Sequence, residues 1–428
     1  MRIVESKDKG FEALLSEILK RGDEDTSSVE EAVKEIIFAV RSRGDDALVE
    51  YTRRFDKADV KGRLEVKPVE IDRAIKSVPK ADIKLLELAS DRIESFHRGQ
   101  VENSWFTTDR DGTILGARVT PLERAGIYVP GGKAAYPSTV LMNAIPAKVA
   151  GVNEIIMMTP PGRAGIDPLV LSAARIAGVN RIFRVGGAQA VAALAYGTKS
   201  IPRVDKITGP GNIFVATAKR LVFGRVDIDM IAGPSEILVI NDGTGDASWI
   251  AADLLSQAEH DELASSMLIT TSDAMAKAVS AEVEKQTKRL MRKAIARASI
   301  DRYGVIIVSK DLSDAAAISN RIAPEHLELF VERPFELMGE IRNAGAIFLG
   351  AYTPEAAGDY LAGPNHTLPT GGTARFSSPL GVYDFVKRTS VISFSKESFG
   401  KLGNAVKRFA DLEGLEAHGK SAAQRLKK

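Results

Sequence analysis

The residues of this 428-residue chain that could do chemistry gather around four of its five histidines. They are His260, His326, His366 and His418, and each has an acid, an amide side chain or glycines near it in the sequence. The fifth, His97, stands in the charged segment SDRIESFHRGQ and is expected to be a solvated position on a helix. Cysteine is absent, so the chain has no thiolate metal ligand, disulfide or thiol nucleophile.

The segment SQAEH, residues 256–260, places an amide and an imidazole near the end of a predicted helix. Gln257 and His260 are three positions apart, so they project from the same helical face and can bind the same ion. Such pairs are also common on helices that bind nothing. A purely structural role is therefore the alternative for this segment taken alone.

The segment APEHLE, residues 323–328, places Glu325 directly beside His326 after a proline. A turn that begins at the proline can direct both side chains into one cleft. A carboxylate and an imidazole supply two proton-transfer groups, and the imidazole titrates near neutral pH. The alternative is an acid at the start of a helix, where it would only stabilise the helix dipole.

Two further segments add oxygen and nitrogen donors. The glycine- and proline-rich residues 358–366 are expected to form a functional loop, because such a segment has little packing role. The segment EGLEAH, residues 413–418, adds acids and a histidine to an otherwise plain basic helix. The four candidate metal ligands are Gln257, His260, Asp359 and His418. Oxygen and imidazole donors without sulfur suit zinc or manganese in an open catalytic site.

Three glycine-rich turns fall where a predicted strand ends and a helix begins. They are VPGG at residues 129–132, VGGAQ at 185–189 and TGPGN at 208–212. Ligands bind at the carboxyl ends of parallel strands, and helix N-termini favour phosphate groups. The standard dinucleotide fingerprint, GxGxxG with an acid roughly 20 residues later, is missing. Ordinary strand-to-helix turns that need glycine are the alternative.

The elements that must position these residues change in kind along the chain. Roughly the first 110 residues are mainly helical by their apolar period, apart from a strand predicted at residues 113–120. The longest amphipathic stretches are residues 29–55 and 71–96. From about residue 128, strands and helices alternate regularly, which implies βαβ units on parallel sheets. The predicted strands are residues 154–159, 181–185 and 204–208 in a first series, and 237–240, 266–270, 305–308 and 346–349 in a second.

We therefore predict an α/β fold with two parallel-sheet domains, and the N-terminal helices belong to the domain of the second series. The predicted divisions are a helical segment at 1–25, a first domain at 26–127 and 236–380, a second domain at 128–235 and a C-terminal arm at 381–428. The first domain holds the metal and catalytic residues, and the second holds the glycine turns. The arm is expected to be basic and helical over residues 387–428.

Bulk composition limits the partners. The chain has 58 basic and 56 acidic residues, and this balance gives no reason to expect nucleic acid or an anionic membrane as a partner. No stretch reaches the ~20 apolar residues that cross a bilayer. The N-terminal residues lack the apolar core of a signal peptide, so a cytoplasmic location is expected.

Five segments together resemble the histidinol dehydrogenase family, in the family's order and over nearly the whole chain. They are RAGIYVPGG at 124–132, AGPSE at 232–236, SQAEH at 256–260, APEHLE at 323–328 and GPNHTLPT at 363–370. The resemblance implies two Rossmann-like domains in an aldehyde-dehydrogenase-like architecture. It also implies a homodimer whose C-terminal arm crosses to the active site of the partner.

The resemblance also implies roles for particular residues. It makes Glu325 and His326 the proton-transfer pair. The implied zinc ligands, for one ion per subunit, are Gln257, His260, Asp359 and His418. The implied substrate contacts are Ser235, Glu413, His326 and those four ligands. The implied NAD contacts are Tyr128, Gln189 and Asn212, which lie in or beside the three glycine turns. Glu413 and His418 would serve the neighbouring subunit.

The activity implied by the resemblance is the zinc-dependent oxidation of L-histidinol through L-histidinal to L-histidine with two NAD, the end of histidine biosynthesis. Neutral His326 would accept the alcohol proton, and a second hydride would leave from the hydrated aldehyde. An alternative is a related dehydrogenase of another diol, such as sulfopropanediol, although residues 374–380 (ARFSSPL) are similar to the histidinol enzymes. The rival from another class is a non-catalytic metal- or nucleotide-binding regulator, which would not explain the Glu325–His326 pair.

Overall fold

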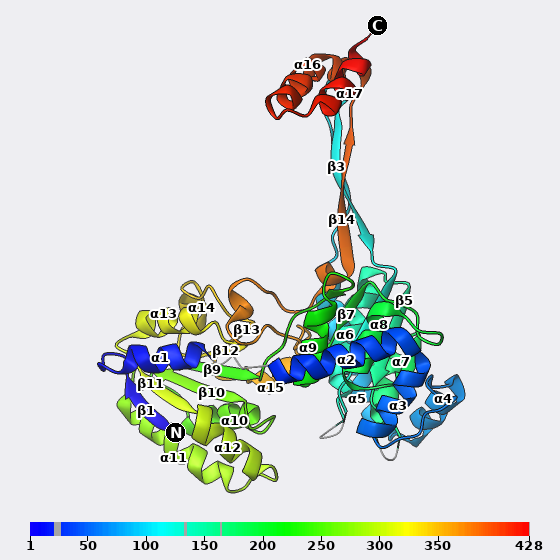
Figure 1. The fold of residues 1–428 in the computed structure, drawn as a ribbon. Coiled ribbons are helices and arrows are strands. Elements are labelled where there is room, and N and C mark those ends of the chain that lie inside the picture. Colours follow the sequence, from blue (N-terminus) through cyan, green and yellow to red (C-terminus); the bar gives the residue numbers. More distant parts are fainter. Residues whose placement is uncertain (21–26, 132–134, 163–164, 428) are drawn as a thin grey trace. The chain divides into compact units, whose positions relative to one another are not determined.

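The computed structural model describes residues 1–20, 27–131, 135–162 and 165–427 (Figure 1). The chain divides into two units, each described here by itself. The first unit comprises Met1–Gln100 and Glu123–Phe385, and the second comprises Val101–Leu122 and Val386–Lys428. The first unit contains two parallel sheets, which confirms the predicted α/β class.

Sheet A of the first unit carries the second series of predicted strands. Its strand order is β1 (Arg2–Glu5), β11 (Val305–Val308), β10 (Ser265–Thr270), β9 (Glu236–Asn241), β12 (His326–Phe330) and β13 (Ala346–Leu349). All of its pairs are parallel. Every residue of β9 and β12 is buried, as expected for central parallel strands with both faces covered.

Helices cover both faces of sheet A. Alternate side chains of β9 enter different cores, since successive residues of a strand face opposite sides. Leu238 packs with Phe11 of α1 and with α13, whereas Val239 packs with Leu254 of α10 and with α11. The helices of this part are α1 (Phe11–Leu19), α10 (Ala247–Ala258), α11 (Asp273–Thr287), α12 (Lys293–Tyr303), α13 (Leu312–Ile322), α14 (Pro334–Met338) and α15 (Glu355–Tyr360).

Sheet B carries the first series of predicted strands and is also parallel. Its strand order is β6 (Arg181–Arg184), β5 (Glu154–Thr159), β4 (Arg124–Tyr128), β7 (Lys206–Thr208) and β8 (Asp227–Ile228). The remaining helices of the first unit are α2 (Ser27–Arg43), α3 (Asp45–Phe55), α4 (Pro68–Ser77), α5 (Lys80–Arg98), α6 (Pro137–Ala150), α7 (Pro168–Ala177), α8 (Gly187–Tyr196) and α9 (Ile213–Val222), with short 3-10 helices η1 (Thr373–Arg375) and η2 (Val382–Phe385).

The N-terminal helices α2 and α3 share a core with sheet B. Val33 and Leu48 belong to the same buried cluster as Ile156 and Phe183. This packing differs from the expectation that these helices join the domain of the second series. The sequence shows that an amphipathic helix has a buried face but does not show which sheet covers it. The segment before them also begins with a strand, β1, where only helix was expected.

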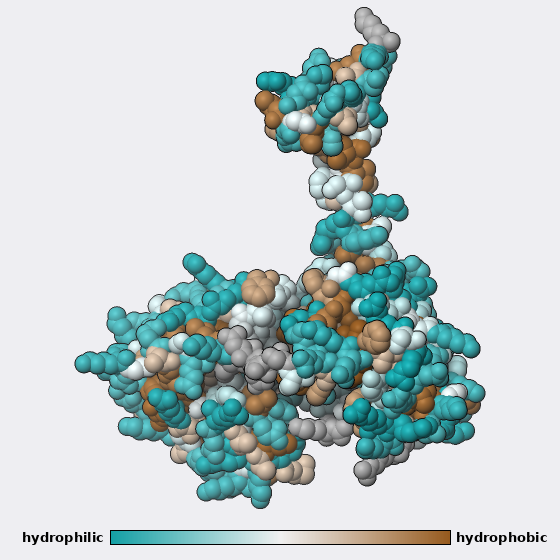
Figure 2. Space-filling view, in the orientation of Figure 1, coloured by the Kyte–Doolittle hydropathy of each residue, from teal (hydrophilic) through white to brown (hydrophobic). Residues whose placement is uncertain are grey.

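The second unit is built around antiparallel strands in the order β14 (Val386–Ser393), β3 (Ile114–Pro121) and β2 (Trp105–Thr108). Helices α16 (Lys396–Leu412) and α17 (Glu416–Leu426) complete it. The expectation that residues 387–428 are entirely helical is wrong for β14, which pairs with β3 along its whole length. Figure 2 shows apolar residues on the surface of this unit. The exposed large apolar residues of the unit include Trp105, Phe106, Ile392, Phe409 and Leu412.

His97 is not the solvated residue that its charged surroundings indicate. It lies in the last turn of α5 and is fully buried, with its Nδ1 2.8 Å from the carbonyl oxygen of Ile93. Burial lowers the pKa of His97. The charges beside it in the sequence belong to other faces of the same helix, and His97 shares the inward face with Ile93 four residues earlier.

Helix boundaries in this region follow local chain geometry. The predicted helix at 29–55 is two helices separated at Gly44, whose φ of 54° suits glycine. The stretch 71–96 is likewise divided, between Val78 and Pro79. Among the described residues, no helix combines the length and the apolar composition needed to cross a membrane.

Asp56 allows the effect of burying a carboxyl group on protein stability to be tested. It is the C-cap residue of α3, where a negative charge opposes the helix dipole, and burial raises its pKa to about 6. The pKa of this carboxyl group is about 4 in the unfolded chain and about 6 in the folded protein. The folded protein therefore becomes less stable relative to the unfolded chain as the pH rises through this range. Asp56→Asn should therefore raise the melting temperature by about 1–2 °C at pH 8, with the gain vanishing near pH 4.

The control is Asp59→Asn, because hydrogen bonds from the Lys61 main chain and from Arg53 lower the pKa of Asp59. This variant should leave the melting temperature at pH 8 unchanged or slightly lower. Equal gains from both variants, or a gain for Asp56→Asn that persists at pH 4, would contradict the argument.

Candidate functional site

Glu325 and His326 lie where α13 gives way to β12. The helix ends at Ile322, Ala323 adopts a left-handed conformation with φ 51°, and His326 opens the strand. The alternative of an acid at a helix start is therefore wrong, because a strand follows. Glu325 and His326 are both buried, with relative exposures of 6% and 4%.

The main chain of Glu236 holds both side chains. Strand β12 pairs with β9 so that His326 lies opposite Ile237, next to Glu236. The Glu236 amide donates to Glu325 Oε2 at 2.8 Å, and the Glu236 carbonyl lies 3.0 Å from His326 Nδ1. A carbonyl can only accept, so Nδ1 carries the proton in this contact and Nε2 keeps its lone pair.

The electrostatics of the pair follow from burial. Burial lowers the pKa of His326, and this effect outweighs the nearby negative charge of Asp359. Burial also raises the pKa of Glu325 well above its ordinary value, more than the bond from the Glu236 amide lowers it. Neutral His326 can accept a proton at Nε2, and Glu325 is a stronger base than a free glutamate once ionised.

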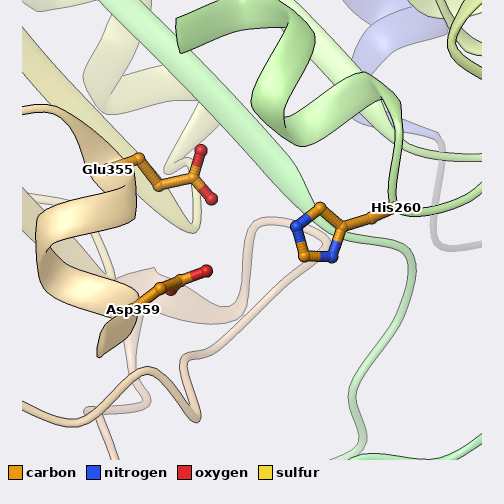
Figure 3. Close-up of side chains that lie close together, drawn as sticks. All are labelled: His260, Glu355 and Asp359. Carbon is orange, nitrogen blue, oxygen red and sulfur yellow. The ribbon is translucent and has the colours of Figure 1, made fainter. Parts of the chain in front are cut away.

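Three potential metal ligands lie beside this pair (Figure 3). One side-chain atom from each of His260, Glu355 and Asp359 lies within 4.8 Å of the others. His260 follows the end of α10 at Ala258, so it lies in a turn and not on the helix as expected. Glu355 and Asp359 lie four residues apart on α15, on one face of that short helix.

Glu355 is the residue that the sequence analysis did not single out. The candidate segment was taken to begin at residue 358 and to be a loop, whereas Asp359 lies in α15. The available signal was the four-residue spacing of the two acids. Glu355 is buried, and its carboxylate accepts a hydrogen bond from Ser256 Oγ at 2.9 Å.

Gln257, on α10, links Glu355 to the Glu236 main chain. With its amide nitrogen facing Glu355, Gln257 donates to Glu355 Oε1 at 2.5 Å and its oxygen accepts from the Glu236 amide at 2.9 Å. Gln257 is buried and lies directly beside the candidate ligands. Its assignment as a zinc ligand stays a prediction, as do the other assigned roles.

The chemistry of this donor set fits a divalent cation. Burial raises the pKa of Glu328 and of Glu355 well above the ordinary value, and the Glu355 amide donates to Glu328 Oε1 at 2.7 Å. His326 Nε2 is buried and has no hydrogen-bond partner among the described residues. It lies 3.8 Å from Glu355 Oε1 and 3.9 Å from Asp359 Oδ1. A divalent cation would allow these buried carboxylates to stay ionised, and mixed oxygen and imidazole donors suit zinc.

The other predicted site residues lie around this cluster or in the second unit. Ser235 immediately precedes β9 and is half-buried. His366 Nδ1 lies 3.8 Å from Asp359 Oδ1. Glu413 is the C-cap residue of α16, and His418 lies in the first turn of α17; both are exposed residues of the second unit.

The three glycine turns lie at the predicted places, after β4, between β6 and α8, and between β7 and α9. Gly132 of the first turn lies outside the described residues. Tyr128 is buried, and its hydroxyl accepts from the Gly187 amide at 3.0 Å. Gln189 Oε1 is buried without a hydrogen-bond partner in the described part of the chain. Asn212 caps α9, accepting from the amides of residues 214 and 215.

Comparisons with known proteins agree with this architecture. A family model described as histidinol dehydrogenase matches residues 19–426. The chain is 61% identical over 428 residues to a histidinol dehydrogenase of Syntrophotalea carbinolica, covering 100% of this chain and 99% of that protein. It is 60% identical over 429 residues to one of Geobacter metallireducens, with coverages of 100% and 98%. The crystal structure of histidinol dehydrogenase from Elizabethkingia anophelis matches with a TM-score of 0.94 and 36% identity, covering 100% of this chain and 98% of that chain.

Metal content provides a test of the cluster. Wild-type protein should bind about one zinc ion per chain, because the cluster offers a single set of ligands. His260→Asn should lose most of this zinc while its melting temperature in chelator stays close to wild type, since the exposed imidazole contributes little packing. Zinc per chain can be measured by inductively coupled plasma mass spectrometry after dialysis.

The matched control is Glu262→Gln, which removes an exposed acid two residues from His260 and outside the cluster. It should retain wild-type zinc. Full zinc content in His260→Asn would show that the metal is held elsewhere.

Proposed function

Because the chain belongs to the histidinol dehydrogenase family, we propose that it oxidises L-histidinol through L-histidinal to L-histidine at the site formed by Glu325, His326 and the adjacent ligand cluster. The enzyme is an NAD-dependent oxidoreductase that uses zinc. The observation that carries the proposal is the buried Glu325–His326 pair, held by the main chain of Glu236 beside the cluster of His260, Glu355 and Asp359. A regulatory protein has no need for a proton acceptor in that position.

The residues of the cluster would hold the metal and orient the substrate. Gln257, His260 and Asp359 are the ligands that this subunit would supply, and Glu355 would fix the Gln257 amide. When bound, zinc supplies a positive charge that fixes the amine and imidazole of histidinol, and NAD supplies the hydride acceptor. Tyr128, Gln189 and Asn212 are the proposed nucleotide contacts, at the carboxyl ends of β4, β6 and β7.

His326 would serve the alcohol step. Its Nδ1–H stays on the Glu236 carbonyl, so Nε2 accepts the hydroxyl proton as the carbinol hydrogen leaves as hydride. The buried position keeps the imidazole neutral before the reaction. Asp359 is close enough to favour the imidazolium that forms, with Oδ1 3.9 Å from Nε2.

Glu325 would serve the aldehyde step. Aldehyde oxidation commonly uses a cysteine adduct, and this chain has no cysteine. Water must therefore add to the aldehyde carbon to give the hydrate, from which the second hydride leaves. Water needs a base to remove its proton, and burial raises the pKa of Glu325 well above its ordinary value, which makes its carboxylate a stronger base.

The second unit would complete the site of a partner subunit in a homodimer. Glu413 and His418 are exposed, as are apolar residues of the same unit, including Phe409 and Leu412. Exposed apolar clusters of this kind favour an interface between chains. We take the partner to be a second copy of this chain, with Glu413 contacting substrate and His418 completing the zinc ligands. A cytoplasmic location belongs to the same proposal.

The division of labour between Glu325 and His326 can be tested by half-reactions. Wild-type enzyme should form two NADH per histidinol, and a sulfonated diol should give none. Glu325→Gln keeps the shape of the side chain but cannot accept a proton. It should slow the oxidation of histidinal to histidine by ~10²-fold or more, while the reduction of histidinal by NADH falls less than about threefold.

His326→Asn is the companion variant and should slow the interconversion of alcohol and aldehyde in both directions. Glu332→Gln, an exposed acid just beyond β12, should leave both half-reactions unchanged. Equal losses of the two half-reactions in Glu325→Gln would show that the two residues do not divide the work.

Shared sites can be tested by complementation. His326→Ala and His418→Ala should each be inactive as homodimers. In a verified mixed dimer, one site would receive intact His326 from one chain and intact His418 from the other, so about half of the wild-type activity per dimer should return. Mixed dimers without activity would argue that each site is built within a single subunit.

A further inference from the structure

A fully buried ion pair lies beside sheet B, and none of the proposed catalytic steps uses it. Lys219 lies on α9 and Asp229 follows β8, and their side chains are 2% and 1% exposed. The amino group contacts Asp229 Oδ1 directly. Isolated charges are seldom buried this deeply, and a buried pair gains little stability over apolar residues of similar size. Stability therefore does not account for the pair.

Both members of the pair bind the main chain of Gly209, the first glycine of the TGPGN turn. Asp229 Oδ2 accepts from the Gly209 amide at 2.8 Å, and Lys219 Nζ donates to the Gly209 carbonyl at 3.0 Å. The donor and the acceptor of one residue are thus fixed by two opposite charges. Charge-assisted hydrogen bonds of this kind are shorter and stronger than neutral ones.

Gly209 is packed so closely that no other residue fits at its position. Its φ is +111°, and a Cβ at this position would lie 2.1 Å from the carbonyl oxygen of Tyr128. The turn therefore rests against the end of β4. The hydroxyl of Tyr128 in turn accepts from Gly187 at the start of α8. Gly209 is therefore linked by contacts to Tyr128, beside the first glycine turn, and through Tyr128 to Gly187 in the second.

We propose that Lys219 and Asp229 are positioning residues for NAD, which hold the TGPGN turn and the start of α9 in the conformation that binds the nucleotide. The proposal rests on the function proposed above, in which Asn212 of this turn contacts NAD. Lys219 and Asp229 lie beneath the turn and touch no substrate. Their effect is on the affinity for nucleotide through Gly209, and histidinol binding at the metal cluster is independent of it.

A second buried lysine, Lys206 in sheet B, provides the matched control. The amino group of Lys206, on β7, lies 2.9 Å from Asp227 Oδ2 and 3.5 Å from Asp384 Oδ1, both of them side-chain carboxylates. Lys206→Met with Asp384→Asn removes one buried and one half-buried charge without removing a bond to Gly209. It therefore measures the general effect of losing buried charge from this sheet.

The experiment compares three double variants with wild-type enzyme. Lys219→Met with Asp229→Leu removes both charges and both bonds to Gly209. Lys219→Met with Asp229→Asn removes the charges but keeps an acceptor for the Gly209 amide. The Kd for NADH is measured by fluorescence titration without histidinol, together with the KM for NAD, the KM for histidinol and the zinc content. Amide hydrogen exchange of residues 206–215 is followed in the nucleotide-free protein.

We expect the leucine variant to raise the Kd for NADH and the KM for NAD about tenfold, with faster amide exchange in the turn. The asparagine variant should lie between it and wild type. Both should keep the wild-type kcat within about twofold, the KM for histidinol and the zinc content, because the metal cluster is not touched. The Lys206 control should keep the wild-type Kd for NADH.

Four results would overturn the proposal. A folded leucine variant with wild-type Kd and exchange would show that the pair does not position the turn, and so would equal losses in the Lys206 control. Wild-type protein that fails to bind NADH would overturn the function proposed for the turns, and this proposal with it. If the leucine variant does not fold, a wild-type Kd in the asparagine variant contradicts the role of the charges.

Discussion

The candidate site depends on one parallel strand pairing, that of β9 with β12. This pairing puts His326 opposite Ile237, so that the peptide groups of Glu236 reach both acid and imidazole. The amide orients the carboxylate and the carbonyl orients the ring. The proposed proton-transfer pair is thus positioned by main-chain bonds, which a strand holds more rigidly than a loop can hold side chains. A slip of one residue in this register would move both side chains away from the Glu236 main chain.

Burial makes the same region electrostatically unusual. Desolvation raises the pKa of three neighbouring glutamates, Glu325, Glu328 and Glu355, and lowers that of His326. A protein keeps such a set of acceptors only where something offsets their mutual repulsion. A divalent cation does this while the same burial keeps His326 neutral and ready to accept a proton. The proposed metal site and the proposed proton acceptor therefore depend on the same exclusion of water.

The two sheets of the first unit carry different groups of candidate site residues. In sheet A, Glu236 and His326 lie at the amino ends of β9 and β12. In sheet B, the glycine turns lie at the carboxyl ends of β4, β6 and β7, the usual place for a nucleotide in a parallel sheet. Most strands of both sheets were predictable because buried parallel strands are continuous apolar runs, as in Glu154–Thr159 and Val305–Val308. The strands β8 and β12 are among those that were not predicted, since β8 has only two residues and β12 carries His326 and Glu328 within it.

The sequence by itself determined the strand and helix alternation, the glycine turns, and the pairing of Glu325 with His326, because each is local in the chain. Only the tertiary structure decided which residues meet across long separations. Glu355 lies close to His260 and Asp359 in space, and His97 is buried. Neither fact can be inferred from the residues adjacent to them in the sequence. The packing of α2 and α3 on sheet B was decided in the same way. An amphipathic pattern reports that a face is buried, and the partner that covers it is chosen by shape and volume in the folded chain.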